Sequence, residues 1–405
     1  MDAETWLQAS LGDDILLVSG QHIDAVDYND DPSGYPYLTG PADFPDGIVR
    51  VTKYTSRPKT TCEKGDILLT VKGSGTGKLA LAADSYCISR QLMAVRPKSW
   101  DRRFVYFTLE SLTESMRRAA VGFIPGITRS DVLDAALPLP PLPEQRKIAA
   151  ILSSVDEAIE KTQAVIDQVQ VVKKGLMQEL LTRGLPGRHK KFKQTEIGEI
   201  PEEWDVVALQ ELVAEDATIT YGIVQAGPHI DDGVPYIKTG DMRREGIREV
   251  GLGRTSREIA ARYHRSAVKT GDLVYSIRAS VGMVHQVPNT LDGANLTQGT
   301  ARISPAEKMN NRFLLWALRG PSSQQWIERR TKGTTYREIT LKTLRAAPLA
   351  VPSLTEQAEI SASIDAVEER GWRESKIDAA LVELKQALMS VLLTGELRVT
   401  PDPAT

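Results

Sequence analysis

The sequence is poor in the residues that build disulfide frameworks and metal sites. Only two of its 405 residues are cysteine, Cys62 and Cys87, and no CxxC spacing occurs. This usage argues against a disulfide scaffold or a zinc ribbon and fits the reducing cytoplasm. The histidines share no ligand spacing with one another or with the cysteines, so we predict no metal site: His22, His189, His229, His264 and His285.

Signals for secretion or membrane insertion are also missing. The stretch Met1–Ser10 has neither the basic segment nor the apolar core of a signal peptide. No apolar run approaches the ~18 residues that a membrane-spanning helix needs. With 41% hydrophobic residues, 25% charged residues and a net charge of −3, the composition is that of a globular cytoplasmic protein. A chain of 405 residues predicts two to four domains.

One stretch, "VKGSGTGKLAL" at Val71–Leu81, resembles a phosphate-binding loop. A Walker loop has the pattern G-x-x-x-x-G-K-[ST]. Here Lys72 occupies the first glycine position and Leu79 replaces the magnesium-binding hydroxyl. No G-x-G-x-x-G and no Asn/Asp-Pro-Pro-aromatic motif is present either. We therefore expect neither nucleotide hydrolysis nor methyl transfer from this chain, and we assign no catalytic residue.

What the sequence does contain is an internal repeat of about 200 residues. The segments "PYLTG", "KGDILLTVKGSGTG", "RRFVYFTL" and "GLMQELLTRG" return in the same order as "PYIKTG", "TGDLVYSIRASVG", "NRFLLWAL" and "ALMSVLLTGE". A duplicated unit of this size predicts two related domains with shared elements rather than a solenoid. The twin of the glycine loop has lost its lysine, which also argues against nucleotide binding. Both copies keep a strand, a cation, a serine and a glycine.

The last part of each repeat has a fixed length. The shift between copies is 198 residues at Trp6/Trp204, but it stays at 212 from Glu144/Glu356 to Thr182/Thr394. Residues 144–182 carry heptads of apolar residues, and residues 356–395 carry a less regular series that Gly371 and Asp378 interrupt. We predict two helices, each about 58 Å long, that form a coiled coil. The predicted interface comprises Ile148, Leu152, Val155, Ile159, Ile166, Val169, Leu176, Leu180, Ile360, Ile364, Val367, Leu381, Leu388 and Leu392.

The alternative is that each helix lies along its own globular domain; equal helix lengths favour mutual packing. In either case the helices divide the chain into two globular segments, called here heads. If the helices pack together, they hold the two heads at a set distance. The predicted divisions are a first head (1–143), a first helix (144–183), a linker (184–203), a second head (204–355), a second helix (356–395) and a tail (396–405). "LPLPPLPEQ" at Leu137–Gln145 could be a polyproline ligand, but a stiff entry into the helix explains it better.

Positive charge is concentrated in the heads. Residues 50–103 hold twelve Lys/Arg against four Asp/Glu, and residues 312–345 hold eight against two. Basic heads on a nearly neutral chain favour specific nucleic-acid binding, although a single charge run is often only a solvated face. Loops near 122–132 and 333–344 add Arg and hydroxyl groups, with a polar turn before a helix as the alternative interpretation. The DNA-binding candidates are Lys72, Ser74, Thr76, Lys78, Thr128, Arg129, Lys238, Arg243, Arg278, Ser280, Thr334, Thr335, Tyr336 and Arg337.

Across nearly its whole length the sequence resembles the specificity subunits of type I restriction–modification systems. The resemblance is carried by "KGDILLT" in the head, "PLPPLPEQRKIAAIL" leading into the helix, and "EIGEIPEEWDVVAL" opening the second copy. It implies an α+β fold: two mixed α/β target-recognition domains in a pseudo-two-fold arrangement, separated by two long antiparallel helices. It also implies that each head reads one half of a bipartite, asymmetric DNA site.

The resemblance further implies partners. Two methyltransferase subunits and two motor-nuclease subunits would bind this chain, and S-adenosylmethionine, ATP and magnesium would be held by those partners. The chain itself is expected to bind no cofactor and to be a non-catalytic recognition subunit of an adenine methyltransferase or restriction complex. Two alternatives remain at this stage, a protein-assembly scaffold that does not bind DNA and a stand-alone DNA-modifying enzyme.

Overall fold

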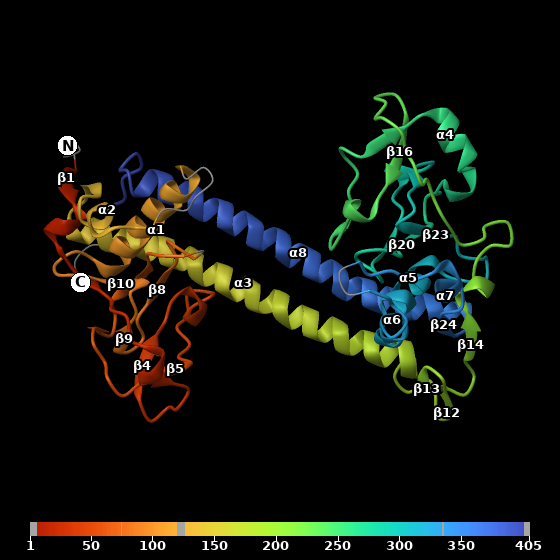
Figure 1. The fold of residues 1–405 in the computed structure, drawn as a ribbon, viewed down its shortest axis with the longest axis horizontal. Coiled ribbons are helices and arrows are strands. Elements are labelled where there is room, and N and C mark those ends of the chain that lie inside the picture. The colour runs from red at the N-terminus through yellow and green to blue at the C-terminus, as the bar shows by residue number, and fades with distance from the viewer. Residues whose placement is uncertain (1–5, 74, 120–125, 334–335, 401–405) are drawn as a thin grey trace. The chain divides into compact units, whose positions relative to one another are not determined.

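In a computed structural model of the chain, the structure describes residues 6–73, 75–119, 126–333 and 336–400. The backbone divides into two compact units, a first unit of residues 1–164 and 375–405 and a second unit of residues 165–374. Two long helices, α3 (Leu142–Arg183) and α8 (Leu354–Leu392), each contribute one end to each unit (Figure 1). The division therefore falls within the long helices.

The first unit is built on a four-stranded antiparallel sheet in the order β2-β10-β7-β8. Along β7, Ile67 and Leu69 face one hydrophobic core while Leu68 faces another, as the two-residue period of a strand requires. The first core lies against helices and the second lies against a five-stranded sheet, β3-β5-β4-β9-β6. The bounds are β1 Leu7–Ser10, β2 Ile15–Ser19, β3 Tyr28–Asn29, β4 Tyr35–Leu38, β5 Lys53–Thr55, β6 Thr61–Cys62, β7 Ile67–Thr70, β8 Leu79–Leu81, β9 Tyr86–Ile88, β10 Leu92–Pro97, α1 Arg102–Ala119, α2 Arg129–Leu133 and β11 Ala136–Leu139.

The second unit repeats this plan. Its central sheet has the order β15-β23-β20-β21, and along β20 Leu273 and Tyr275 face one core while Val274 faces the other. Both copies of the repeat are thus mixed α/β. The bounds are β12 Phe192–Thr195, β13 Gly198–Pro201, β14 Asp205–Ala208, β15 Thr220–Tyr221, β16 Val234–Ile237, β17 Met242–Arg243, β18 Gly246–Ile247, β19 Gly253–Thr255, α4 Arg257–Arg262, β20 Leu273–Ser276, β21 Val284–Gln286, β22 Asn295–Leu296, β23 Thr300–Ile303, α5 Asn311–Arg319, α6 Pro321–Glu328, α7 Leu341–Arg345 and β24 Pro348–Val351.

The ends of the long helices follow local rules. Pro143 lies in the first turn of α3, where its missing N–H costs nothing. Gly184 follows the helix with a φ of 74°, the left-handed conformation that favours glycine at a helix end. The first turn of α8 is capped by Ser353, whose Oγ accepts a hydrogen bond from Glu356 N at 3.4 Å, because the helix begins at Leu354.

Within each unit the ends of both long helices enter the core of the head. Ile148 and Leu152 of α3 share a core with Leu392 of α8 in the first unit. Leu180 of α3 shares a core with Ile360 and Ile364 of α8 in the second unit. Each helix therefore belongs to both cores, a geometry that neither sequence-based alternative described.

A buried carboxylate near the start of each long helix is held in the same way in both units. Glu144 Oε2 accepts from Trp6 Nε1 at 3.1 Å and from Arg398 Nη2 at 2.8 Å. Glu356 accepts from Trp204 Nε1 at 3.1 Å and lies 2.8 Å from His189 Nε2. In each case one partner comes from the segment that follows the other long helix, Arg398 after α8 and His189 after α3. These two contacts, called here the first and second clasp, tie both helices to the repeat that surrounds them.

A second set of contacts joins the helices by charge. Lys385 Nζ of α8 lies 2.7 Å from Asp156 Oδ1 of α3 and 2.9 Å from Glu110 Oε1 of α1 in the first unit. Lys173 Nζ of α3 lies 2.6 Å from Glu368 Oε2 of α8 in the second unit. Lys173/Lys385 and Asp156/Glu368 are each 212 residues apart, so the duplicated segments make the same ion pair twice.

Candidate nucleic-acid interface

In the first unit, three loops meet where β7 ends. The amide of Val71 donates to Gln91 O at 2.8 Å, and the amide of Ile127 donates to Val71 O at 2.9 Å. The glycine loop (71–78), the turn before β10 (89–92) and the described end of the loop before α2 (126–128) are thus joined through one residue. The two loops that carry sequence-predicted candidates lie together at the same edge of the central sheet.

The second unit builds the same junction around Ile277. Its amide donates to Gly299 O at 2.9 Å and its carbonyl accepts from Ile339 N at 3.0 Å. A further bond from Ala279 N to Arg337 O, at 2.9 Å, brings the loop before α7 against the glycine loop. We call these two assemblies the first and second loop cluster.

The glycine loop itself is a hairpin connection, because β7 pairs antiparallel with β8 and β20 pairs antiparallel with β21. A phosphate-binding loop instead leads from a strand into a helix. Gly77 has a φ of 84° and donates to Thr70 O at 2.7 Å, while Gly282 has a φ of 94° and donates to Ser276 O at 3.1 Å. The glycines are therefore explained by the tight turn.

Strain marks the second loop. Ala279 is the one non-glycine residue with positive φ, at 59°, in the part of the chain that the structure describes. That conformation costs on the order of 1 kcal/mol for a residue with a Cβ. Its bond to Arg337 O and the pairing of Arg278 with Glu338 in an isolated bridge hold it in place.

Candidates in the first loop cluster differ in their accessibility. Lys72 is exposed and Lys78 is half-buried. Thr76 is 5% exposed and its hydroxyl donates to Gly73 O at 2.7 Å, so it serves the loop itself. Thr128 caps α2 by accepting from Asp131 N at 3.2 Å, as the alternative of a polar turn before a helix expected. Ser74 lies outside the described residues.

Arg129 is exposed but engaged on one side. Its Nη1 donates to Leu17 O at 3.0 Å and to Ser19 Oγ at 2.8 Å, which ties the guanidinium to the end of β2. The other guanidinium nitrogens have no partner among the described residues, so the group keeps donors for a phosphate or a base.

Candidates in the second loop cluster are mostly exposed. Ser280 is exposed, and Tyr336 is 87% exposed. Arg278 Nε lies 3.4 Å from Glu338 Oε2, and Arg337 forms an ion pair with Glu328. Exposed pairs of this kind contribute about 0–1 kcal/mol, so an incoming phosphate can replace the carboxylate. Thr334 and Thr335 lie outside the described residues.

The two remaining candidates flank the second loop cluster to different degrees. Lys238 is exposed, and the hydroxyl of its neighbour Thr239 donates to Gly299 O at 3.3 Å, which places this turn against the cluster. Arg243 is exposed on the short strand β17. Arg243 makes none of the backbone hydrogen bonds that join the described loops of the cluster.

A hollow of about 590 Å³ opens beside Ser280. Arg319 at its wall donates to Val284 O at 2.8 Å and lies 2.9 Å from His285 Nδ1. Burial, together with this guanidinium, lowers the pKa of His285 to about 4. His285 is therefore neutral near pH 7, and the cation of Arg319 is committed to internal contacts.

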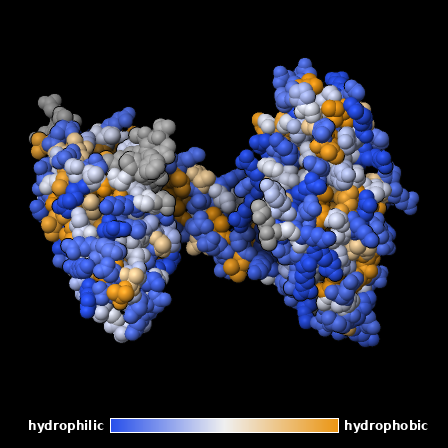
Figure 2. Space-filling model, in the orientation of Figure 1, coloured by the Kyte–Doolittle hydropathy of each residue, from blue (hydrophilic) through white to orange (hydrophobic). Residues whose placement is uncertain are grey.

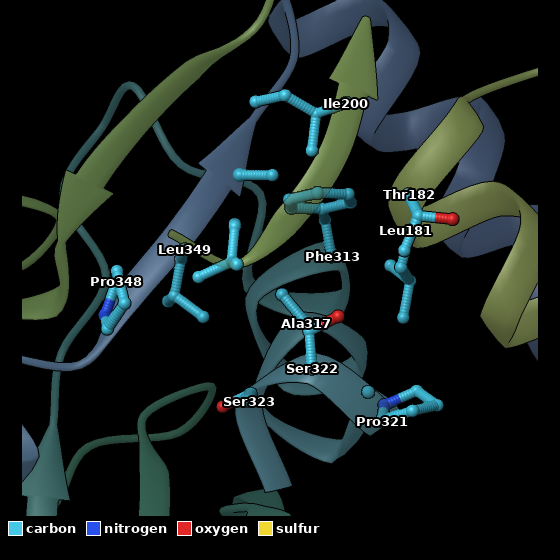
Figure 3. A pocket seen from close by; sticks show the side chains of 13 residues that line it. Leu181, Thr182, Ile200, Phe313, Ala317, Pro321, Ser322, Ser323, Pro348 and Leu349 are labelled. Atoms are coloured by element: carbon cyan, nitrogen blue, oxygen red, sulfur yellow. The ribbon is translucent and has the colours of Figure 1, made fainter. Parts of the chain in front are cut away.

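Another cavity, of about 30 Å³, belongs to the hydrophobic packing of the second unit. Phe313 and Ala317 of α5, Leu349 of β24 and Ile200 of β13 point toward it, and Leu181 closes it from the end of α3 (Figure 3). Its lining offers few polar groups, so this cavity is part of the core rather than a ligand site.

The comparisons with known proteins agree with this duplicated arrangement. The family described as the type I restriction modification DNA specificity domain matches residues 4–170 and again residues 201–378. The chain belongs to this family. The two matches correspond to the two copies of the repeat and to the two mixed α/β folds.

Relatives within the family are named as specificity subunits. The chain is 27% identical to the type I restriction enzyme MjaVIII specificity subunit of Methanocaldococcus jannaschii over 98% of this chain and 94% of that protein. It is 27% identical to the EcoBI specificity subunit of Escherichia coli over 75% of this chain and 67% of that protein. The resemblance expected from the sequence is confirmed.

Solved structures share the fold. The S subunit of a type I restriction-modification system from M. genitalium matches with a TM-score of 0.59 at 16% identity, covering 99% of this chain and 98% of that one. A structure described as showing complex assembly and conformational transition of the type I R-M system matches with a TM-score of 0.59 at 18% identity, covering 97% and 99%.

Metal-binding clusters and membrane-spanning helices are absent from the described part of the chain. Among the described residues, no group of three or more His, Cys, Asp or Glu side chains is arranged to hold a metal ion. No described helix is both long and apolar enough to span a bilayer. Figure 2 shows hydrophobic residues interspersed among hydrophilic ones on the visible face of each unit.

One element of this specificity-subunit chain was missed by sequence reasoning. The turns 89–92 and 297–300 complete both loop clusters, yet neither appears among the repeated motifs. "SRQL" and "TQGT" share no residue at matching positions, so the repeat is not visible there. The two turns can be aligned by their position, because each directly precedes or enters an apolar strand, β10 in the first copy and β23 in the second.

Proposed function

We propose that this chain reads a bipartite, asymmetric DNA site, one half with each loop cluster. The observation that carries the proposal is the duplicated cluster itself, which has the same backbone hydrogen bonds around Val71 and Ile277 but different side chains. Two clusters with the same backbone arrangement but different exposed side chains suit two half-sites of different sequence. Membership of a DNA-specificity family supports the same role.

Within each cluster we assign the exposed cations to phosphates and base edges. Phosphate contacts position a protein on DNA, and side chains on loops read the bases. Lys72 in the first cluster directly follows Val71, and Arg278 in the second directly follows Ile277; Val71 and Ile277 are the residues that join the loops of each cluster. The proposed contact residues that remain exposed or half-buried are Lys72, Lys78, Arg129, Lys238, Arg243, Arg278, Ser280, Tyr336 and Arg337.

We further propose that α3 and α8 form an antiparallel coiled coil that sets the spacing of the half-sites. The ion pairs Lys385–Asp156 and Lys173–Glu368 support antiparallel pairing within each unit. None of the fourteen predicted interface residues is exposed. The buried ones are Ile148, Leu152, Val155, Val169, Leu180, Ile360, Ile364 and Leu392, and the half-buried ones are Ile159, Ile166, Leu176, Val367, Leu381 and Leu388.

Gly371, which interrupts the heptads, fits this packing. It is buried, and a Cβ placed there would lie 3.3 Å from Val169 Cγ1 of α3. The missing side chain therefore allows a close approach of the two helices in the second unit. A broken heptad at this point supports contact rather than opposing it.

The partners belong to the same proposal. Several apolar side chains on the long helices are exposed, which suits contact with other subunits: Val171 (65%), Val172 (46%), Trp372 (46%), Ile377 (48%) and Leu384 (47%). We propose that two methyltransferase subunits, and two motor-nuclease subunits where cleavage occurs, assemble with this chain in the cytoplasm. S-adenosylmethionine, ATP and magnesium would be bound by those partners, and this chain would be a non-catalytic recognition subunit.

The test is selection from randomised duplexes with the complex purified from its source cells through a tag on this chain. The expected result is a two-part consensus with a constant spacer, and the same sequence should carry modified bases in the source genome only when the gene is present. Binding without a consensus would favour the protein scaffold. Cleavage or methylation by the purified chain alone would favour the stand-alone enzyme.

A further inference from the structure

The missed turns are equivalent by their hydrogen bonds. Leu92 N donates to Ser89 O at 2.9 Å in the first, and Thr300 N donates to Thr297 O at 3.2 Å in the second. Each turn leads into the strand beside the glycine loop, because Leu92 pairs with Thr70 and Thr300 pairs with Ser276. The two turns therefore sit at the same place in their loop clusters.

Their backbones are firmly held on both sides. The first residue of each turn donates to the neighbouring sheet, from Ser89 N to Leu38 O at 3.0 Å and from Thr297 N to Ile237 O at 3.2 Å. The carbonyl of the third residue of each turn accepts a hydrogen bond, from Val71 N to Gln91 O in the first cluster and from Ile277 N to Gly299 O in the second. Such a turn presents the side chain of its second residue on a rigid support.

That second residue is Arg90 in the first cluster and Gln298 in the second. Both are exposed, and their side chains make no hydrogen bond or ion pair to the part of the chain that the structure describes. By contrast, Arg278, Arg337 and Arg129 all have internal partners. Arg90 and Gln298 are therefore among the exposed polar groups of the clusters whose donors and acceptors are uncommitted within the described residues.

The chemistry of these two side chains differs in a way that bases distinguish. An arginine fork donates twice to O6 and N7 of guanine, whereas a glutamine amide both donates and accepts and so matches N7 and N6 of adenine. We infer that Arg90 reads a guanine in one half-site and that Gln298 reads an adenine at the corresponding place of the other. This inference rests on the proposed function.

Neighbouring cations support base reading at these positions. Lys72 follows Val71, whose amide is bonded to Gln91, and Arg278 follows Ile277, whose amide is bonded to Gly299. A phosphate held by the exposed cation would bring the adjacent base edge toward the turn. Each cluster would then contact DNA in the same way: Lys72 or Arg278 would bind a phosphate, and the guanidinium of Arg90 or the amide of Gln298 would bind the adjacent base.

The experiment compares the tagged full-length chain, in complex from its source cells, with the variants Arg90→Gln and Gln298→Arg by selection from randomised duplexes. Arg90→Gln is expected to remove the guanine preference, or replace it with adenine, at one position of one half-site. The loss of preference should be roughly 5- to 150-fold, as for a bidentate contact. Gln298→Arg is expected to replace adenine with guanine in the other half-site.

Matched controls are Arg50→Gln, whose arginine is engaged with Asp46, and Gln194→Arg, at an exposed position of strand β12. The unchanged half-site of each variant also serves as an internal measure of folding. Half-sites identical to those of the parent in both turn variants would overturn the inference while leaving the proposed function intact. Failure of the parent itself to select a two-part site would overturn the proposed function.

Discussion

Replacing Glu356 with glutamine tests the second clasp with almost no change of shape. The side chain is 4% exposed and lies against Trp204 Nε1 and His189 Nε2. Leu185 N adds a longer contact of 3.4 Å. Glutamine keeps one acceptor oxygen but loses the negative charge that both ring donors face.

The size of the effect follows from these contacts. Hydrogen bonds to a charged group contribute about 1.5–3 kcal/mol each. Loss of the charge weakens two of them, so the second unit should lose about 2–4 kcal/mol of unfolding free energy. At about 1.4 kcal/mol per factor of ten, amides that exchange by opening of this unit should exchange roughly 30- to 700-fold faster.

Hydrogen exchange of the full-length chain measures the stability of the second unit by itself. A single melting temperature does not, because the chain has two units. The control is Glu359→Gln on the same helix, where the carboxylate pairs with Arg188 but is 44% exposed. That change should cost less than about 1 kcal/mol. Equal exchange in both variants would refute the assignment of a buried, charge-dependent clasp.

Three further predictions concern charge. Burial alone would raise the pKa of Glu144, but hydrogen bonds from Arg398, Trp6 and the Val399 amide hold that pKa below its usual value. The first unit should therefore lose stability as pH falls through the carboxyl range, and Arg398→Gln should make that loss smaller in urea titrations between pH 7 and pH 3. Arg278→Ala should weaken binding of the second half-site and lower the salt slope of binding by about 1, because its cation is assigned to a phosphate; unchanged protection of that half-site in footprints at low protein concentration would contradict the assignment. Lys385→Met should destabilise the first unit by about 3 kcal/mol, because the carboxylates of Asp156 and Glu110 lose their cation. Lys161→Met, which removes only an exposed pair with Glu157, should cost less than about 1 kcal/mol; equal urea midpoints for the two variants would contradict this.

Much of the fold could be predicted from the duplication. A conserved shift of 212 residues located both long helices, because a helix of fixed length allows no insertion between its contacts at the two ends. The same shift aligns Lys173 with Lys385 in the sequence, although it does not say what they contact. A glycine directly after the first heptad segment predicts a left-handed helix cap at Gly184, and its φ of 74° agrees.

The first turn of α8 illustrates what local rules leave open. Thr355 directly precedes the heptad segment that starts at Glu356 and carries a capping hydroxyl, yet the helix begins one residue before it and Ser353 makes the capping bond. Both residues carry a hydroxyl near the same boundary, so chemistry alone does not choose between them.

The candidate site was predictable in its strands and not in its turns. The repeated strand and glycine pattern identified Lys72 and Arg278, since a hairpin loop needs conserved turn residues. Arg90 and Gln298 differ in type and lie in segments without a common motif, so no repeat could reveal them. Backbone hydrogen bonds define their equivalence, and these depend on strands that are far apart in the sequence.

Insertion of residues into the middle of α3, with a compensating insertion in α8, tests the central claim most directly. Selection from randomised duplexes should then return both parental half-sites with a changed number of unread base pairs between them. Changed half-sites at the parental spacing would contradict the account.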